Sequence, residues 1–201
     1  MNPIPRVYPV VGSAELLRRM VAVGARLVQL RVKDLQKEQV RRLVRDAKAV
    51  CARYNAQLVV NDYWQIAIEE GCDFVHLGQT DLDDADIPAL RRAGARLGVS
   101  THDAVELDRA LALDPDYIAL GPIYPTQLKV MPWAPQGLSR ITEWKRRMGT
   151  KPLVAIGGLT VERLEGVFRA GADCAAVVTD VVMHRDPDAR MSEWLAEAAA
   201  L

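Results

Sequence analysis

Short apolar runs alternate along the chain with amphipathic segments. Between Gln39 and Tyr54 the apolar residues follow i, i+3, i+4, i+7 spacing, which predicts the buried stripe of a helix. The β-branched, apolar runs predict eight strands, at Val7–Val11, Leu27–Leu30, Gln57–Val60, Phe74–Leu77, Leu97–Val99, Tyr117–Leu120, Pro152–Ile156 and Cys174–Val178. Eight strands alternating with helices in 201 residues favour a single α/β domain, a (β/α)8 TIM barrel, over a doubly wound sheet.

One turn sequence recurs between a helical segment and a strand. It occurs at Gly24-Ala25-Arg26, Gly71-Cys72-Asp73, Gly94-Ala95-Arg96 and Gly171-Ala172-Asp173. Glycine there suits the left-handed residue that ends many helices, so four copies of the turn predict four copies of one βα unit. We expect residues 1–201 to form one domain, with room for only a short helix in the first unit.

Charge and cysteine content narrow the class of protein. Lys and Arg total 26, as do Asp and Glu, so no global field points to nucleic acid or to an anionic membrane. Three cysteines without CxxC spacing (Cys51, Cys72 and Cys174) predict buried free thiols in a reducing compartment. The sequence has no signal-peptide core and no apolar stretch of ~18 residues. We therefore expect a soluble cytoplasmic protein, and the sequence is compatible with a homo-oligomer.

Two neighbouring strands each end close to a carboxylate. The third predicted strand is followed by Asn61-Asp62, and the fourth by Gly78-Gln79-Thr80-Asp81. Ligands of parallel α/β folds bind beyond the C-terminal ends of the strands, so Asp62 and Asp81 are candidates for one acidic site. The alternative is that each Asp caps the following helix, since Asp is a favoured N-cap residue.

The second predicted strand runs into cationic residues. With a period of two, Gln29, Arg31 and Lys33 share one face, opposite the apolar residues between them. If the apolar face packs on the helices, both cations point into the barrel mouth, where a bound anion is a suitable partner. The alternative is a frayed strand end with solvated cations.

The later strands are also followed by candidate ligand contacts. Ser100 either contacts a ligand or, like Thr101, caps the helix that begins near Asp103. The longest connection, residues 121–137, carries four prolines, two aromatic residues and Lys129, which favours a lid over a flexible linker.

The ends of the last two predicted strands suggest a phosphate cup. Gly157-Gly158 and the backbone at Val178-Thr179 suit such a cup, although tight turns that need glycine explain the glycines equally well. Asp180 would repel a phosphate there. Carboxylates beside cations suggest a divalent ion, Mg²⁺ by default, that bridges to a polyphosphate. Two separate anion sites suggest two phosphorylated substrates that are joined.

Seven motifs, in order along the chain, resemble the thiamine-phosphate synthase family. They are Gln29-x-Arg31-x-Lys33, Val60-Asn61-Asp62, His76-Leu77-Gly78-Gln79-x-Asp81, Gly98-Val99-Ser100, Gly121-Pro122-Ile123-Tyr124-Pro125-Thr126-x-x-Lys129, Ile156-Gly157-Gly158 and Val178-Thr179. The resemblance runs from about Val7 to Thr179. It implies a TIM barrel that joins hydroxymethylpyrimidine pyrophosphate to a thiazole phosphate, giving thiamine phosphate and pyrophosphate. The implied partners are these small phosphorylated molecules.

The resemblance also implies roles for matching residues. Mg²⁺ would lie on Asp62 and Asp81, and catalytic roles would fall to Ser100, Lys129 and Arg31. Substrate binding would fall to Gln29, Arg31, Lys33, Asn61 and Lys129 for the pyrophosphate, to Ser100 for the pyrimidine, and to Thr126, Gly158, Val178 and Thr179 for the thiazole phosphate. The family is understood to lose pyrophosphate first, after which the thiazole nitrogen attacks the pyrimidine methylene cation. That order suits an inventory without a protein nucleophile.

Two departures from the family pattern touch the thiazole-phosphate side. Leu128 stands where the family usually has Thr, and Asp180 follows Thr179 where the family usually has Ser and then a small residue. We expect activity to persist with an altered thiazole-phosphate site. Two alternatives are a thiazole tautomerase, which would not require the full metal and pyrophosphate set, and a non-catalytic homologue that binds a thiazole phosphate.

Overall fold

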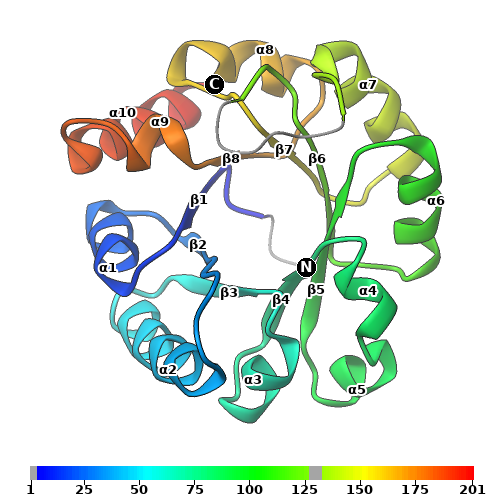
Figure 1. Cartoon of the computed structure of the whole chain (residues 1–201). Helices are drawn as coiled ribbons and strands as arrows, with labels where there is room; N and C mark the ends of the chain where they lie inside the picture. The colour runs from blue at the N-terminus through cyan, green and yellow to red at the C-terminus, as the bar shows by residue number, and fades with distance from the viewer. Residues whose placement is uncertain (1–3, 127–132) are drawn as a thin grey trace.

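The computed structural model describes residues 4–126 and 133–201, and its strands close into a parallel barrel (Figure 1). The strands follow one another around the barrel in chain order: β1 (Val7–Val11), β2 (Leu27–Leu30), β3 (Gln57–Asn61), β4 (Phe74–Leu77), β5 (Arg96–Thr101), β6 (Tyr117–Leu120), β7 (Leu153–Ile156) and β8 (Cys174–Val177). β8 pairs in parallel with β1 and completes the closure. The predicted TIM barrel is confirmed.

Helices form the outer ring (Figure 1). They are α1 (Ala14–Val23), α2 (Lys37–Arg53), α3 (Trp64–Glu69), α4 (Asp81–Asp84), α5 (Ile87–Arg92), α6 (Ala104–Ala112), α7 (Gly137–Met148), the 3₁₀ turn η1 (Val161–Arg163), α8 (Leu164–Arg169), α9 (Thr179–Val182) and α10 (Pro187–Ala200). The first connector holds a helix of 10 residues. The glycines of the four repeated turns all have positive φ, between 65° and 127°, as the repeat predicts.

Alternating side chains along each strand build two separate cores. The outer core lies between strands and helices and takes Val28, Leu30 and Val60, whereas the inner core fills the barrel and includes Tyr8, Val59, Phe74 and Tyr117. Tyr8 and Tyr117 meet edge to face, with ring centroids 5.9 Å apart. Bulky rings therefore close the barrel interior and form a floor beneath its mouth.

Gly98 on β5 makes room for one of these rings. A Cβ atom built on Gly98 would lie 2.1 Å from Cζ and 2.5 Å from the hydroxyl oxygen of Tyr117. Because no real Cβ atom approaches another atom so closely, the missing side chain at Gly98 allows the Tyr117 hydroxyl to reach the middle of the barrel.

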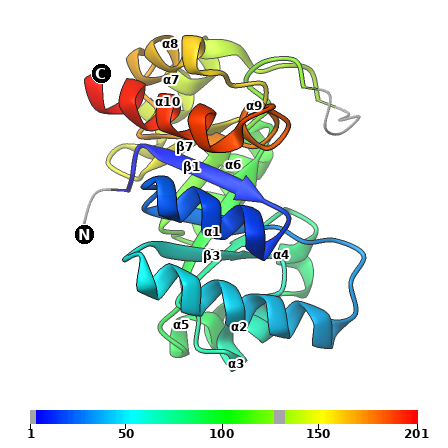
Figure 2. The same cartoon turned by 90° about the vertical axis from the view of Figure 1, so that its left-hand side faces the viewer.

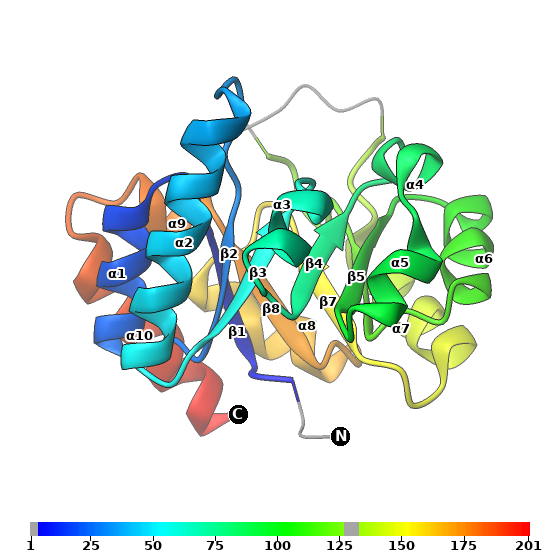
Figure 3. The ribbon, with the colours of Figure 1, turned by 90° about the horizontal axis from the view of Figure 1, so that it is seen from below.

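Different segments of the chain lie at the two ends of the barrel. The C-terminus and the start of β1 lie at one end, and α4 lies at the other, beyond the strand ends (Figures 2 and 3). Among residues 4–126 and 133–201, no helix is long and apolar enough to cross a bilayer.

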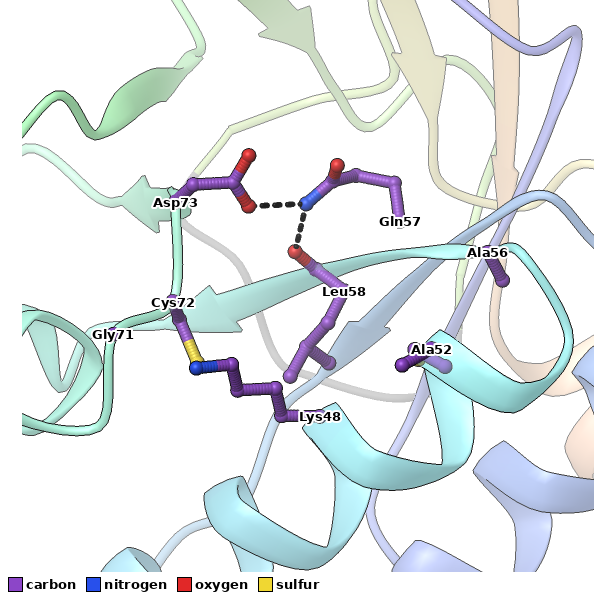
Figure 4. Close-up of a pocket in the computed structure, with 9 residues that line it drawn as sticks. Lys48, Ala52, Ala56, Gln57, Leu58, Gly71, Cys72 and Asp73 are labelled. Atoms are coloured by element: carbon purple, nitrogen blue, oxygen red, sulfur yellow. Dashed lines mark hydrogen bonds between the residues drawn. The ribbon is translucent and has the colours of Figure 1, made fainter.

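A small cavity of about 150 Å³ opens at the N-terminal ends of β3 and β4 (Figure 4). Cys51 and Cys72 line it, and burial raises their thiol pKa values to about 12 and about 11. All three cysteines are free and buried, as predicted. Gln57 donates to Asp73 there at 2.8 Å. Thiols that stay protonated are poor nucleophiles, so neither Cys51 nor Cys72 is a candidate nucleophile.

Candidate active site

Two carboxylates lie together beyond β3 and β4. The backbone N–H of Asp62 donates to the carbonyl oxygen of His76 at 3.0 Å, which ties the end of β3 to β4. The Asp81 carboxylate accepts from the N–H of Gly78 at 3.1 Å. Burial raises the pKa of Asp81, and the neighbouring Asp62 carboxylate raises it further. The strand ends therefore hold two mutually repelling acids, an arrangement that favours a bound cation.

The alternative in which Asp62 and Asp81 cap helices is wrong. The N-cap of α3 is Tyr63, without a side-chain capping bond, and the N-cap of α4 is Thr80, so that Asp81 lies inside the helix. Neither carboxylate therefore serves as the N-cap of a helix.

Lys33 and Arg31 leave β2 at the same edge. β2 ends at Leu30, so both cations lie on the following loop, while Gln29 faces the barrel interior as the alternation predicts. The Lys33 ammonium group forms an ion pair with Asp62, although its side chain stays 50% exposed, so Lys33 is both paired and solvated. Arg31 is exposed, and no carboxylate of the described residues pairs with it. Its charge is one of the causes that lower the pKa of His76.

Asn61 supplies a buried donor that lacks an acceptor. Its side chain is 5% exposed, and its Nδ2 atom has no hydrogen-bond partner among the described residues. An unsatisfied buried amide costs about 1–3 kcal/mol. Asn61 is inward-facing on β3, directly beside Asp62. An anion held next to the two carboxylates would satisfy this donor.

Ser100 lies on β5, across the mouth from β2. Its hydroxyl oxygen is 2.7 Å from Nε2 of His76, and its carbonyl oxygen accepts from Nε2 of Gln79 at 2.7 Å. The N-cap of α6 is Asp103, whose side chain accepts from the N–H of Glu106. The capping alternative for Ser100 and Thr101 is therefore wrong, and the Ser100 hydroxyl faces the mouth.

Sequence reasoning missed several residues around Ser100. His76 is 7% exposed and has partners on both ring nitrogens, Ser100 on Nε2 and Tyr117 on Nδ1 at 2.7 Å. His76 is thus a strand-end residue with both ring nitrogens satisfied, and one of its partners is Ser100. Tyr8 and Tyr117 looked like ordinary core residues. The sequence signal that could have found them is the alternation along β1 and β6, which places both side chains inside the barrel.

On the opposite side of the mouth, the chain after β6 packs closely on the turn after β7. A Cβ atom at Gly158 would lie 2.5 Å from the carbonyl oxygen of Pro125 and 2.8 Å from Cβ of Tyr124. The Arg163 guanidinium lies 4.2 Å from the Tyr124 ring centroid and donates to the carbonyl oxygen of Gly158. This packing brings the segment that leads to Thr126 beside Gly158. The predicted site residue Lys129, and Leu128, lie outside the described residues.

Asp180 points away from the expected phosphate position. Its Oδ2 atom accepts from Nε of Arg190 at 2.9 Å and from Nε1 of Trp194 at 2.7 Å. The side chains of Asp180 and Arg190 are only 17% and 14% exposed. The ion pair with Arg190 on α10 therefore balances the negative charge of Asp180, which follows Val178 and Thr179 in the sequence.

The pair Asp62 and Asp81 offers a metal ion two protein ligands. Within the described ranges, no three or more His, Cys, Asp and Glu side chains gather as a metal site. Mg²⁺ commonly takes one or two carboxylates and completes its shell with water and substrate phosphates. The donor set therefore fits Mg²⁺ held jointly with a phosphorylated ligand better than a metal enclosed by protein alone.

The sequence of this chain is similar to a known protein family and to individual members of it. The family model described as thiamine monophosphate synthase matches residues 7–181. A thiamine-phosphate synthase of Rhizobium etli is 56% identical over 192 residues, which cover 96% of this chain and 94% of the relative. A thiamine-phosphate synthase of Citrobacter koseri is 46% identical over 194 residues, covering 96% and 92%.

A solved structure supports the fold. The thiamine phosphate pyrophosphorylase of Pyrococcus furiosus superposes with a TM-score of 0.83 at 22% identity, over 97% of this chain and 96% of that one. Together with the match over residues 7–181, the sequence relatives place the chain in the thiamine monophosphate synthase family.

Proposed function

We propose that this chain joins hydroxymethylpyrimidine pyrophosphate to a thiazole phosphate, forming thiamine phosphate and releasing pyrophosphate. Family membership supports the reaction. The observation that carries the site assignment is the buried, unpartnered Asn61 amide next to the Asp62 and Asp81 carboxylates. The unpartnered donor suits an anion, and the two repelling carboxylates suit a cation. A metal ion bound together with pyrophosphate therefore fits these residues better than a metal ion or a pyrophosphate alone.

The pyrophosphate side is assigned to the ends of β2 and β3. Arg31 and Lys33 supply positive charge, and Asn61 supplies its free donor. Gln29 lies deeper, where Nε2 donates to the Tyr8 hydroxyl at 2.8 Å. That nitrogen carries two hydrogens, so a second bond to the ligand remains open to it. Lys129 belongs to this set by sequence match alone.

A magnesium ion on Asp62 and Asp81 would neutralise charge on the pyrophosphate as it leaves. This chain's own residues hold and orient the leaving group: Arg31 and Lys33 offset its negative charge, and Asn61 fixes its position. No described side chain at the mouth needs to act as a nucleophile. The bond between the pyrimidine methylene carbon and the pyrophosphate would break first, and the thiazole nitrogen would then attack that carbon. This order needs only stabilisation of the leaving group, with Ser100 holding the pyrimidine.

The thiazole phosphate is assigned to the other side of the mouth. Gly158 follows β7, and Val178-Thr179 joins β8 to α9; the register of β7 with β8 makes these turns neighbours. Thr126 follows the segment that packs on Gly158. The ion pair of Asp180 with Arg190 supports a cup that accepts a phosphate despite the acidic residue. Thiazole-phosphate binding is thus expected to persist.

Substitution of a single carboxylate tests the metal assignment. Asp62→Asn should lower Mg²⁺-dependent pyrophosphate release at least about 100-fold, because a first ligand matters more than the surrounding residues that tune metal sites 10–100-fold. Asp84→Asn is the matched control, since Asp84 lies exposed on α4 next to the site; it should change the rate less than about twofold.

A binding measurement separates metal loss from general damage. Mg²⁺ with pyrophosphate should raise the unfolding temperature of the wild type and of Asp84→Asn, but not of Asp62→Asn. If Asp62→Asn keeps both turnover and the thermal shift, the metal does not lie on this carboxylate.

A further inference from the structure

An unbroken line of hydrogen bonds crosses the barrel floor from β2 to β5. Nε2 of Gln29 lies 2.8 Å from the Tyr8 hydroxyl, which lies 3.0 Å from the Tyr117 hydroxyl. Tyr117 then lies 2.7 Å from Nδ1 of His76, and Nε2 of His76 lies 2.7 Å from the Ser100 hydroxyl. The first four residues are 0–7% exposed. Each of the five comes from a different strand.

The line has a defined direction because its two tyrosines each have one proton. The Gln29 amide nitrogen can only donate, so the Tyr8 oxygen accepts and must give its own proton to Tyr117. Among the described residues, the Tyr8 oxygen bonds to Gln29 and Tyr117 alone. In the opposite order the Tyr8 proton would be buried without an acceptor, which costs about 1–3 kcal/mol.

Beyond Tyr117, the hydrogen bonds continue in the same direction to the mouth. Tyr117 gives its proton to Nδ1 of His76, so a neutral His76 carries its proton on Nε2 and donates it to the Ser100 oxygen. Because Nδ1 accepts from the Tyr117 hydroxyl, it carries no proton, and His76 is a neutral imidazole in this arrangement. The Ser100 oxygen is then already an acceptor from below, and its own proton points into the mouth.

We propose that Tyr117 and His76, at the end of this line, position the hydroxyl proton of Ser100, so that Ser100 presents a hydrogen-bond donor to an acceptor on the pyrimidine. The inference rests on the proposed function only for the identity of the ligand. A pyrimidine ring nitrogen is an acceptor of the required kind, whereas an exocyclic amino group is not. The buried line thus selects which edge of the ring Ser100 reads.

The tautomer of His76 tests the direction of the line without any substrate. Nitrogen-15 NMR at neutral pH should show His76 protonated on Nε2, with its signals assigned by their loss in His76→Gln. Protonation on Nδ1 would mean that the bonds from Tyr117 through His76 to Ser100 run the other way and that Ser100 donates to His76, which overturns the proposal. This result stands even if the purified protein turns over no substrate, so it is separable from failure of the proposed function.

Kinetics test whether the line acts through Ser100. Tyr117→Phe should raise KM for the pyrimidine pyrophosphate about tenfold, the effect of one hydrogen bond, with a smaller change in KM for the thiazole phosphate. In a Ser100→Ala background, the same substitution should raise KM no further. An equal rise in both backgrounds would show that Tyr117 is merely structural and would overturn its positioning role.

Tyr8→Phe provides the matched control. It removes an equally buried hydroxyl from the same floor, but it leaves Tyr117 with Nδ1 of His76 as its acceptor. The Ser100 proton therefore keeps its direction, and KM for the pyrimidine pyrophosphate should change less than about threefold. A rise as large as that of Tyr117→Phe would show that loss of floor packing, rather than proton direction, affects the substrate.

Discussion

At the scale of one residue, Asp81 carries an energetic cost of ionisation that a bound cation would offset. Burial and the adjacent Asp62 carboxylate raise the pKa of Asp81 in the folded protein. The folded chain therefore binds this proton more tightly than the unfolded chain does. The cost of ionising Asp81 is absent below its unfolded pKa of about 3.9, grows as the pH rises toward the folded pKa, and is fully present above it.

Asp81→Asn should consequently increase the free energy of unfolding at pH 7 when metal is chelated, and this gain should vanish near pH 3, roughly where both states are protonated. Urea denaturation at the two pH values measures the difference. Asp84→Asn, on the same helix but exposed, should stay within about 0.5 kcal/mol of the wild type. A loss of stability for Asp81→Asn at pH 7 would show that the carboxylate contributes favourable contacts instead.

Residue types at strand ends could be predicted, but their contacts could not. The alternation of Gln29, Arg31 and Lys33 with apolar residues predicted which side chain enters the barrel. The direction in which Asp180 points depends on Arg190, ten positions along the chain on another helix, so no local pattern could reveal it. Asp180 is held by partners that become neighbours only in the folded barrel.

At the scale of elements, α9 and α10 are joined by this part-buried ion pair between Asp180 and Arg190. Asp180→Ala should lower the free energy of unfolding by about 1–3 kcal/mol, because Arg190 and the Trp194 indole N–H lose a well-placed acceptor. Glu193→Ala is the matched control: Glu193 also pairs with Arg190, but its side chain is 54% exposed. It should cost less than about 1 kcal/mol. Equal losses, measured by chemical denaturation, would contradict a special role for Asp180.

The eight strands were predictable because each is a short apolar run bounded by turn residues. Predicted and observed bounds agree at Val7–Val11 and Tyr117–Leu120, and β5 extends beyond the predicted Leu97–Val99. The extension includes Arg96, whose guanidinium lies 4.3 Å from the Phe74 ring centroid. Polar strand ends of this kind are stabilised by neighbouring strands, so a local apolar pattern does not detect them.

At the scale of the whole molecule, the two ends of the barrel carry different kinds of side chain. Buried thiols and a small cavity lie at the N-terminal strand ends, and the carboxylates, cations and Ser100 lie at the other end. The floor of Tyr8 and Tyr117 lies between these two ends and connects opposite sides of the mouth. The sequence motifs predicted the residues at the mouth. They could not predict the floor, because no sequence pattern shows which inward-facing residues meet across the barrel.

Release of pyrophosphate by the purified protein is the most direct test of the proposed reaction. Assays with each substrate alone, with both, and with or without Mg²⁺ cover the competing functions. We predict release that requires both substrates and the metal. No release by folded protein that still binds a thiazole phosphate would contradict the account and would favour a tautomerase or a non-catalytic binding protein.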